Sequence, residues 1–104
     1  MLSNSIKYSI NELDYQDKSV VSKVITRNNV GNVTLFAFDE SESLSPHSAP
    51  YDALVLILDG RAEIMIGDNF YQLSKDEFII MPANLMHSVK ALEKFKMLLV
   101  MLKA

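Results

Sequence analysis

The chain is divided into short apolar runs by turn-forming residues, and this division restricts it to an all-β fold. The run 53–58 ends at Asp59-Gly60, and the run 61–66 follows directly. An Asp-Gly pair between two such runs predicts a β-hairpin, because a primed turn needs positive φ at its central residues. Turns at intervals of about 8 to 12 residues predict a sandwich or a small barrel. The other predicted strands are 20–26, 33–38, 70–73, 78–81, 87–90 and 95–102.

The length of the chain sets the number of domains. With 104 residues it matches one domain, 1–104. An apolar fraction of 49% is ordinary for a globular protein and too high for a disordered one. We expect residues 1–30 to form an N-terminal segment that packs on the barrel or exchanges between two barrels. Within it, residues 10–18 are polar enough to be a loop or a single helical turn.

Charge and cysteine content exclude several classes of function. The net charge is −3. Binding to a nucleic-acid backbone needs clustered Lys and Arg, and Glu93 interrupts the densest lysine group here, which is Lys90, Lys94, Lys96 and Lys103. We therefore expect no nucleic-acid partner. The absence of cysteine excludes disulfides, thiol catalysis and Cys-ligated metal sites.

Nothing in the sequence suggests export or membrane insertion. Its first ten residues lack a long apolar core and a cleavage site. The longest apolar run, 53–58, is far shorter than the roughly 20 residues that span a bilayer. The expectation is a cytoplasmic protein with no membrane partner.

Two of the predicted strands are apolar on both faces. Residues two apart share one face of a strand. If Ala53 points into the barrel, Val55 and Ile57 do so too, and the residues between them point outward, namely Leu54, Leu56 and Leu58. The strand 95–102 is equally two-sided, and such strands are buried on both faces. We expect the N-terminal segment to cover part of the outside and a second subunit of a homodimer to cover the rest.

The two histidines lie in two short blocks. The first, residues 45–60, reads S-P-H-S-A-P-Y-D-A-L-V-L-I-L-D-G, and the second, residues 76–87, reads D-E-F-I-I-M-P-A-N-L-M-H. Their spacing resembles the cupin superfamily blocks, roughly G-x5-H-x-H-x3-E-x6-G and G-x5-P-x-G-x2-H. His47 and His87 match the first and last metal ligands, and Gly60 and Pro82 match turn positions. The resemblance covers residues 34–102 and implies a double-stranded β-helix, the cupin or jelly-roll barrel.

The metal-ligand pattern of that family is incomplete in this chain. Ala49 and Ala53 occupy the other two ligand positions, and alanine cannot bind a metal. The resemblance implies a divalent ion (Fe, Mn, Ni or Zn) held weakly by His47 and His87, since metal sites usually have three or four protein ligands. Asp52 is a third candidate ligand, although its strand parity points it the other way. Elsewhere, Ser41 and Asp76 stand where the family often has glycine.

The leading functional hypothesis is a small-molecule-binding cupin with an apolar pocket. Taken singly, each histidine would be interpreted as a loop residue in water; together, in register, they indicate one internal site. The predicted pocket residues are His47, His87, Ala49, Ala53, Val55, Phe36 and Met97, and the methionines are expected to be core fillers. A metal-dependent enzyme of the dioxygenase or isomerase type and a structural or regulatory domain without catalysis are the alternatives, because so widely reused a fold does not name a reaction.

Overall fold

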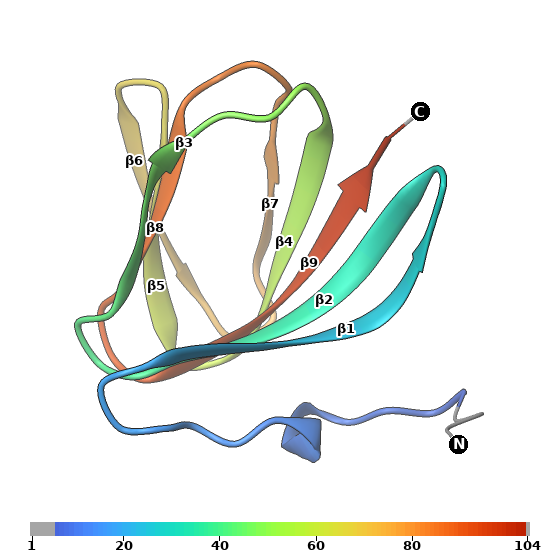
Figure 1. Ribbon diagram of the computed structural model, residues 1–104. Helices are drawn as coiled ribbons and strands as arrows, with labels where there is room; N and C mark the ends of the chain where they lie inside the picture. Colours follow the sequence, from blue (N-terminus) through green and yellow to red (C-terminus); the bar gives the residue numbers. More distant parts are fainter. Residues whose placement is uncertain (1–5, 104) are drawn as a thin grey trace.

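Two antiparallel β-sheets face each other in the computed structural model, which describes residues 6–103 (Figure 1). The five-stranded sheet has the order β1-β2-β9-β4-β7, and the four-stranded sheet has the order β3-β8-β5-β6. The molecule is a double-stranded β-helix, as the sequence predicted. The strands are β1 (Val20–Asn28), β2 (Gly31–Phe38), β3 (Ser43–His47), β4 (Asp52–Asp59), β5 (Arg61–Ile66), β6 (Asn69–Ser74), β7 (Phe78–Met81), β8 (His87–Ala91) and β9 (Phe95–Leu102).

The turn between β4 and β5 depends on Gly60. Its φ is +74°, a left-handed conformation that glycine adopts at little cost. A Cβ atom at this position would overlap the backbone carbonyl of Lys94, so the β8–β9 connection packs directly on the turn. Gly60 therefore has two structural reasons to be glycine.

Four further described positions adopt left-handed backbone without glycine. Lys18, Ser41, Asp76 and Asn84 have φ values of 54°, 69°, 74° and 68°. Ser41 and Asp76 are the positions where the cupin pattern often has glycine. The turn geometry of the pattern is thus retained here although the residue that adopts it most easily is absent.

The inward faces of the two sheets form one apolar core. Ala53, Val55 and Ile57 alternate inward along β4 and are all buried, as predicted from strand parity. Phe38 and Phe95 stack with ring centroids 4.4 Å apart and are fully buried. The buried cluster consists of Phe38, Ala53, Val55, Ile57, Ala62, Ile64, Leu73, Met81, Val89, Ala91, Phe95 and Met97.

Strand β3 is an element that the hydrophobic pattern did not predict. Its sequence is S-L-S-P-H, and only Leu44 is even partly buried. Pro46 lacks a backbone N–H, which is tolerated because β3 lies at the edge of its sheet. Pairing with β8 is irregular between Leu44 and His47 and still brings His47 opposite His87.

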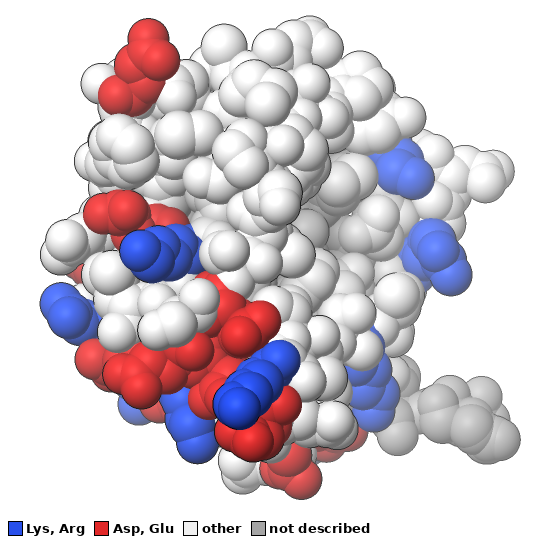
Figure 2. Space-filling model, turned by 60° about the vertical axis from the view of Figure 1, so that its left-hand side comes forward, with Lys and Arg blue, Asp and Glu red and all other residues white. Residues whose placement is uncertain are grey.

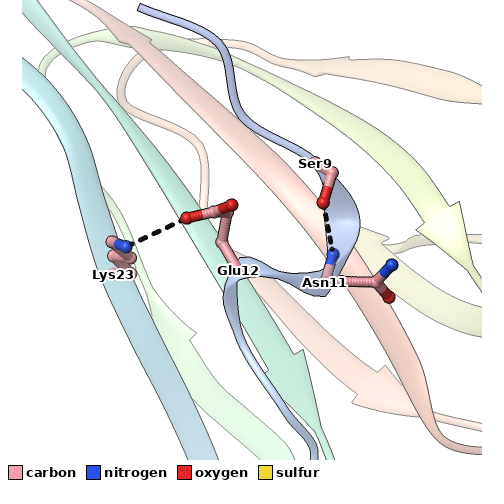
Figure 3. Close-up of polar contacts among 4 residues, drawn as sticks. All are labelled: Ser9, Asn11, Glu12 and Lys23. Atoms are coloured by element: carbon pink, nitrogen blue, oxygen red, sulfur yellow. Dashed lines mark hydrogen bonds and ion pairs between the residues drawn. The ribbon is translucent and has the colours of Figure 1, made fainter. Parts of the chain in front are cut away.

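Residues 6–18, called the strap below, lie across the outer face of the five-stranded sheet (Figure 1). They contain one short 3-10 turn, Ile10–Glu12, within the stretch expected to be a loop or helical turn. Ser9 caps this turn by accepting a hydrogen bond from the Asn11 N–H, and Glu12 pairs with Lys23 of β1 at 3.4 Å (Figure 3).

Two buried or half-buried polar groups hold the strap to the sheet. Lys96 is 5% exposed, and its ammonium group donates to the Ile10 carbonyl at 2.7 Å and lies 5.1 Å from the centre of the Tyr15 ring. The Tyr15 hydroxyl donates to Asp59 at 2.6 Å. Burial and then the Asp59 carboxylate raise the pKa of Tyr15. Under the strap is a cavity of about 320 Å3, lined largely by apolar side chains.

The strap covers only part of the outer face. Leu35, Leu58 and Leu98 line the cavity beneath it. Farther along the same sheet, Phe78 and Ile80 of β7 are 66% and 47% exposed, and Leu54, Leu56 and Val100 are half-buried. Within this chain β1 pairs with its own β2.

Charged side chains gather at one end of the barrel. The connections at residues 39–42, 75–77 and 92–94 lie at the lower end in Figure 1, and Figure 2 shows acidic and basic groups concentrated there. Among residues 6–103 no helix is long and apolar enough to cross a membrane.

Candidate functional site

A small cavity opens between the sheets at the end of the barrel away from most of the charges. Its volume is about 80 Å3. The connections at 48–51 and 82–86 form this end, and the Asn84 N–H joins them by donating to the Ala49 carbonyl at 2.7 Å. The residues that line the cavity are Leu44, His47, Ala49, Tyr51, Ala53, Met81, His87, Val89, Met97, Leu99 and Met101.

His47 and His87 meet in this cavity from neighbouring strands. His47 ends β3 and is exposed, whereas His87 begins β8 and is 6% exposed. Their Nε2 atoms are 3.2 Å apart, and the rings meet edge to face with an interplanar angle of 72°. The structure therefore brings the two sequence-predicted histidines to one point.

Backbone carbonyls constrain the protonation of both rings. Nδ1 of His47 lies 2.8 Å from the Ser45 carbonyl, which can only accept, so Nδ1 carries the proton and Nε2 presents a lone pair. Nδ1 of His87 is buried and forms no hydrogen bond of ordinary geometry among the described residues. Burial lowers the pKa of His87, the His47 ring lowers it further, and the Leu85 carbonyl acts in the opposite direction.

The other predicted pocket residues divide into two groups. Ala49, Ala53 and Met97 line the cavity. Val55 is fully buried in the core, and Phe36 packs against that core. Neither of these two lines the cavity, because it occupies only the open end of the barrel.

Asp52 lies at the edge of the site but is directed elsewhere. It is exposed, does not line the cavity, and uses a carboxylate oxygen to accept a hydrogen bond from the Ala83 N–H at 2.8 Å. This contact ties the start of β4 to the connection after β7. Asp52 thus holds the connection 82–86 at the mouth of the cavity in place.

The donor set does not fit the divalent metal that the family pattern implies. Such sites use two or three histidines with a carboxylate. Here the other two ligand positions are Ala49 and Ala53. In the described part of the chain, no three His, Cys, Asp or Glu side chains gather closely enough to hold an ion.

Two cavity residues that sequence reasoning treated as core fillers are Met81 and Met101. Met81 on β7 and Met101 on β9 both pair with Ala53 on β4, so the three side chains lie on the same inward face of the sheet. The signal that could have found them is strand parity combined with register: Met101 lies four residues beyond Met97 on the same face of β9. The register itself, however, is set by tertiary pairing, which the sequence pattern did not specify.

This architecture, two antiparallel sheets around a cavity with paired histidines at one open end, defines a double-stranded β-helix barrel. A family model described as "Cupin domain" matches residues 34–102, which is most of the chain. The chain belongs to the cupin family.

Solved structures similar to the chain agree with this membership. A conserved protein of unknown function from Streptococcus pyogenes is 31% identical, with a TM-score of 0.91 over 99% of this chain and 91% of that one. A cupin superfamily protein from Desulfitobacterium hafniense is 25% identical, with a TM-score of 0.90 over 100% of this chain and 95% of that one.

A third similar structure is longer than this chain. The cupin 2 conserved barrel domain protein from Leptotrichia buccalis is 36% identical, with a TM-score of 0.88, and the match covers 91% of this chain and 46% of that one. A comparison with functionally curated proteins finds no match. The comparisons therefore give the family and the fold.

Proposed function

We propose that the chain binds a small, uncharged organic molecule in the cavity between its sheets. The observation that carries this proposal is the pairing of two imidazoles within an otherwise mostly apolar lining. A few placed polar groups in an apolar cleft are typical of ligand sites. The volume of about 80 Å3 is well below the roughly 300–1,000 Å3 of pockets for drug-sized ligands, so the ligand has few atoms.

The charge of the ligand follows from the lining. None of the described lining residues is Asp, Glu, Lys or Arg. A charged organic group would be buried there without a side chain of opposite charge, which costs several kcal/mol. A neutral ligand with one carbonyl or hydroxyl group would pair with the histidine nitrogens and place its carbon atoms against the methionine and leucine side chains.

Methionine methyl groups provide the test. Met81, Met97 and Met101 line the cavity, whereas Met65 and Met86 do not. Protein labelled with ¹³C at the methionine methyls is titrated, free of metal, with isobutyramide, isobutyrate and isobutylamine, which share one carbon skeleton. We expect the neutral amide to shift the three cavity signals and leave Met65 and Met86 unchanged. His87→Ala should weaken this binding by about 1 kcal/mol, the contribution of one hydrogen bond.

The outcomes of this titration separate the hypotheses. Equal shifts with the anion or cation would refute the choice of a neutral ligand. If none of the three compounds moves the cavity signals, the proposal of a neutral organic ligand is wrong.

A metal-dependent enzyme of the dioxygenase or isomerase type is the less favoured alternative. It would use His47 and His87 with a third donor. The carboxylate nearest in sequence, Asp52, is held by the Ala83 N–H outside the cavity, so no described carboxylate supplies the missing ligand.

We also propose that two chains associate through the outer face of the five-stranded sheet. The residues left uncovered by the strap form a continuous apolar surface across β7, β4 and β9 (Phe78, Ile80, Leu54, Leu56 and Val100). Contiguous apolar patches of this kind are uncommon on monomers, and a two-fold dimer is the usual solution.

A further inference from the structure

The Nε2 atoms of the two histidine rings lie 3.2 Å apart. The Ser45 carbonyl is 2.8 Å from Nδ1 of His47, so the neutral ring carries its proton on Nδ1 and leaves Nε2 as an acceptor. In the absence of an ion, His87 must donate from Nε2 to bridge the 3.2 Å gap. That tautomer leaves the buried Nδ1 of His87 as an acceptor without a donor, which is unfavourable.

A bound cation would select the other tautomer. If the His87 proton sits on Nδ1, both Nε2 atoms become free to coordinate. For a tetrahedral ion with metal–nitrogen bonds of about 2.0–2.1 Å, two ligand nitrogens lie about 3.3–3.4 Å apart. The observed separation of 3.2 Å is close to this value.

The other lining side chains that carry a donor atom are three methionines, with thioether sulfurs, and Tyr51, with a phenol oxygen. Met81, Met97 and Met101 line the same cavity, and no acidic side chain in the described chain does. Met81 and Met101 flank Ala53, the position that carries a carboxylate in the cupin pattern. Thioether sulfur is a soft ligand that selects Cu(I), whereas divalent Mn, Fe and Mg favour carboxylates.

We infer that the barrel cavity is a site for a soft monovalent ion, Cu(I), coordinated by Nε2 of His47 and His87 and by methionine thioethers. The site replaces the hard carboxylate donor of the cupin pattern by soft sulfur donors. The inference goes beyond the proposed function and does not require an organic ligand.

Competition with a chromophoric chelator tests this inference. Tag-free protein is titrated anaerobically with Cu(I) bicinchoninate in ascorbate, and Zn(II) affinity is measured in parallel. We expect one Cu(I) per chain, bound more tightly than Zn(II). Met81→Leu/Met101→Leu should weaken Cu(I) binding by at least about 10- to 100-fold, the usual effect of disturbing a metal site, and leave Zn(II) binding unchanged.

Matched variants make the result specific. Met65→Leu/Met86→Leu removes two thioethers outside the cavity and should leave Cu(I) affinity as in the native protein. His87→Ala should abolish tight binding of Cu(I). If the Met81→Leu/Met101→Leu protein keeps native Cu(I) affinity, or if Zn(II) binds more tightly than Cu(I), the inference is wrong.

A measurement on the native protein covers the case in which a variant does not fold. Addition of Ag(I), a redox-inert soft ion, to ¹³C-methyl-methionine protein should shift cavity methionine signals and leave those of Met65 and Met86 in place. Shifts confined to Met65 and Met86, or no shifts at all, would contradict a soft-metal site in the cavity. The metal-free titration with isobutyramide is independent, so either proposal can fail while the other stands.

Discussion

Ala53 occupies the position from which a side chain is best placed to change the chemistry of the cavity. It is 4% exposed, points inward from β4, and lies between Met81 and Met101 on the neighbouring strands. Its methyl group leaves room in the cavity and offers no donor. A single substitution here tests whether the barrel retains the geometry of a carboxylate-containing metal site.

We predict that Ala53→Glu creates a divalent-metal site. The new carboxylate would join Nε2 of His47 and of His87 in the two-histidine, one-carboxylate set typical of divalent iron. Zn(II) or Fe(II) affinity, measured calorimetrically on tag-free protein, should rise at least about tenfold, since a charge-assisted interaction contributes about 1.5–3 kcal/mol.

Ala53→Gln is the matched control, because it has the same shape without the charge. An equal gain with glutamine, or no gain with glutamate, would show that a side chain at position 53 does not reach the histidine pair.

The histidine pair was predictable from the sequence, but the rest of the lining was only partly so. His47 and His87 follow from the spacing of two blocks that also contain Gly60 and Pro82. Val55 and Phe36 were expected in the pocket because they share its face. Strand parity, however, predicts which face of the sheet a side chain lies on, but not how far along the barrel it lies. Val55 lies in the packed core, and Phe36 packs against it.

At the scale of elements, the connections impose stricter requirements than the strands do. Gly60 and Gly67 are both left-handed, with φ of +74° and +58°, yet only Gly60 is pressed against another backbone, at the Lys94 carbonyl. At Gly67 an added Cβ would have no neighbour within 4 Å. A side chain at position 67 would therefore meet only the strain of the left-handed backbone, whereas one at position 60 would also overlap a neighbouring backbone.

We predict that Gly67→Ala costs about 1–2 kcal/mol of unfolding free energy, the price of a left-handed alanine. Gly60→Ala should cost at least about twice as much, because the β8–β9 connection must also move. Urea denaturation followed by circular dichroism measures both values. If the two variants lose similar unfolding free energy, the β8–β9 connection moves away from residue 60 at little cost, and this prediction is wrong.

The strands were predictable because short apolar runs, some alternating and some continuous, are bounded by turn-forming residues, and β3 was the exception. Its residues are mostly exposed and include Pro46, so they lack the apolar signal on which the other predictions depended. β3 forms because β8 offers a pairing edge, which is a tertiary effect. The turns at Ser41 and Asp76 likewise keep a left-handed backbone without glycine, the residue that adopts it most easily.

At the scale of the whole molecule, the apolar outer face is the main unexplained surface. Phe78 of β7 and Phe70 of β6 are 66% and 64% exposed, but they lie on different sheets. Only Phe78 adjoins the half-buried Leu56, with which it pairs across the two strands. These two phenylalanines therefore form a matched pair for testing the proposed dimer.

We predict that the native protein is a dimer in multi-angle light scattering and that Phe78→Asp converts it to a monomer. Phe78 is exposed in the single chain, so the charge opposes association without entering the core. Phe70→Asp should leave the dimer intact. Leu56→Asp, at a half-buried position, is expected to cause aggregation or unfolding.

A native protein that is monomeric at micromolar concentration would refute the dimer. The strap would then cover its part of the outer face in the monomer, the surface around Phe78 and Ile80 would face water, and deletion of residues 1–18 should enlarge the surface that binds an apolar dye.

The separation of charge from the cavity mouth has a kinetic consequence. Strand β4 runs between the two ends of the barrel, and its eight residues span about 26 Å at about 3.3 Å per residue. Electrostatic fields at physiological salt fade over about 8 Å. A molecule approaching the mouth is therefore neither drawn in nor repelled by most of the acidic and basic groups. For a ligand of the kind proposed, the rate of arrival should then depend little on ionic strength and little on substitutions at the charged end.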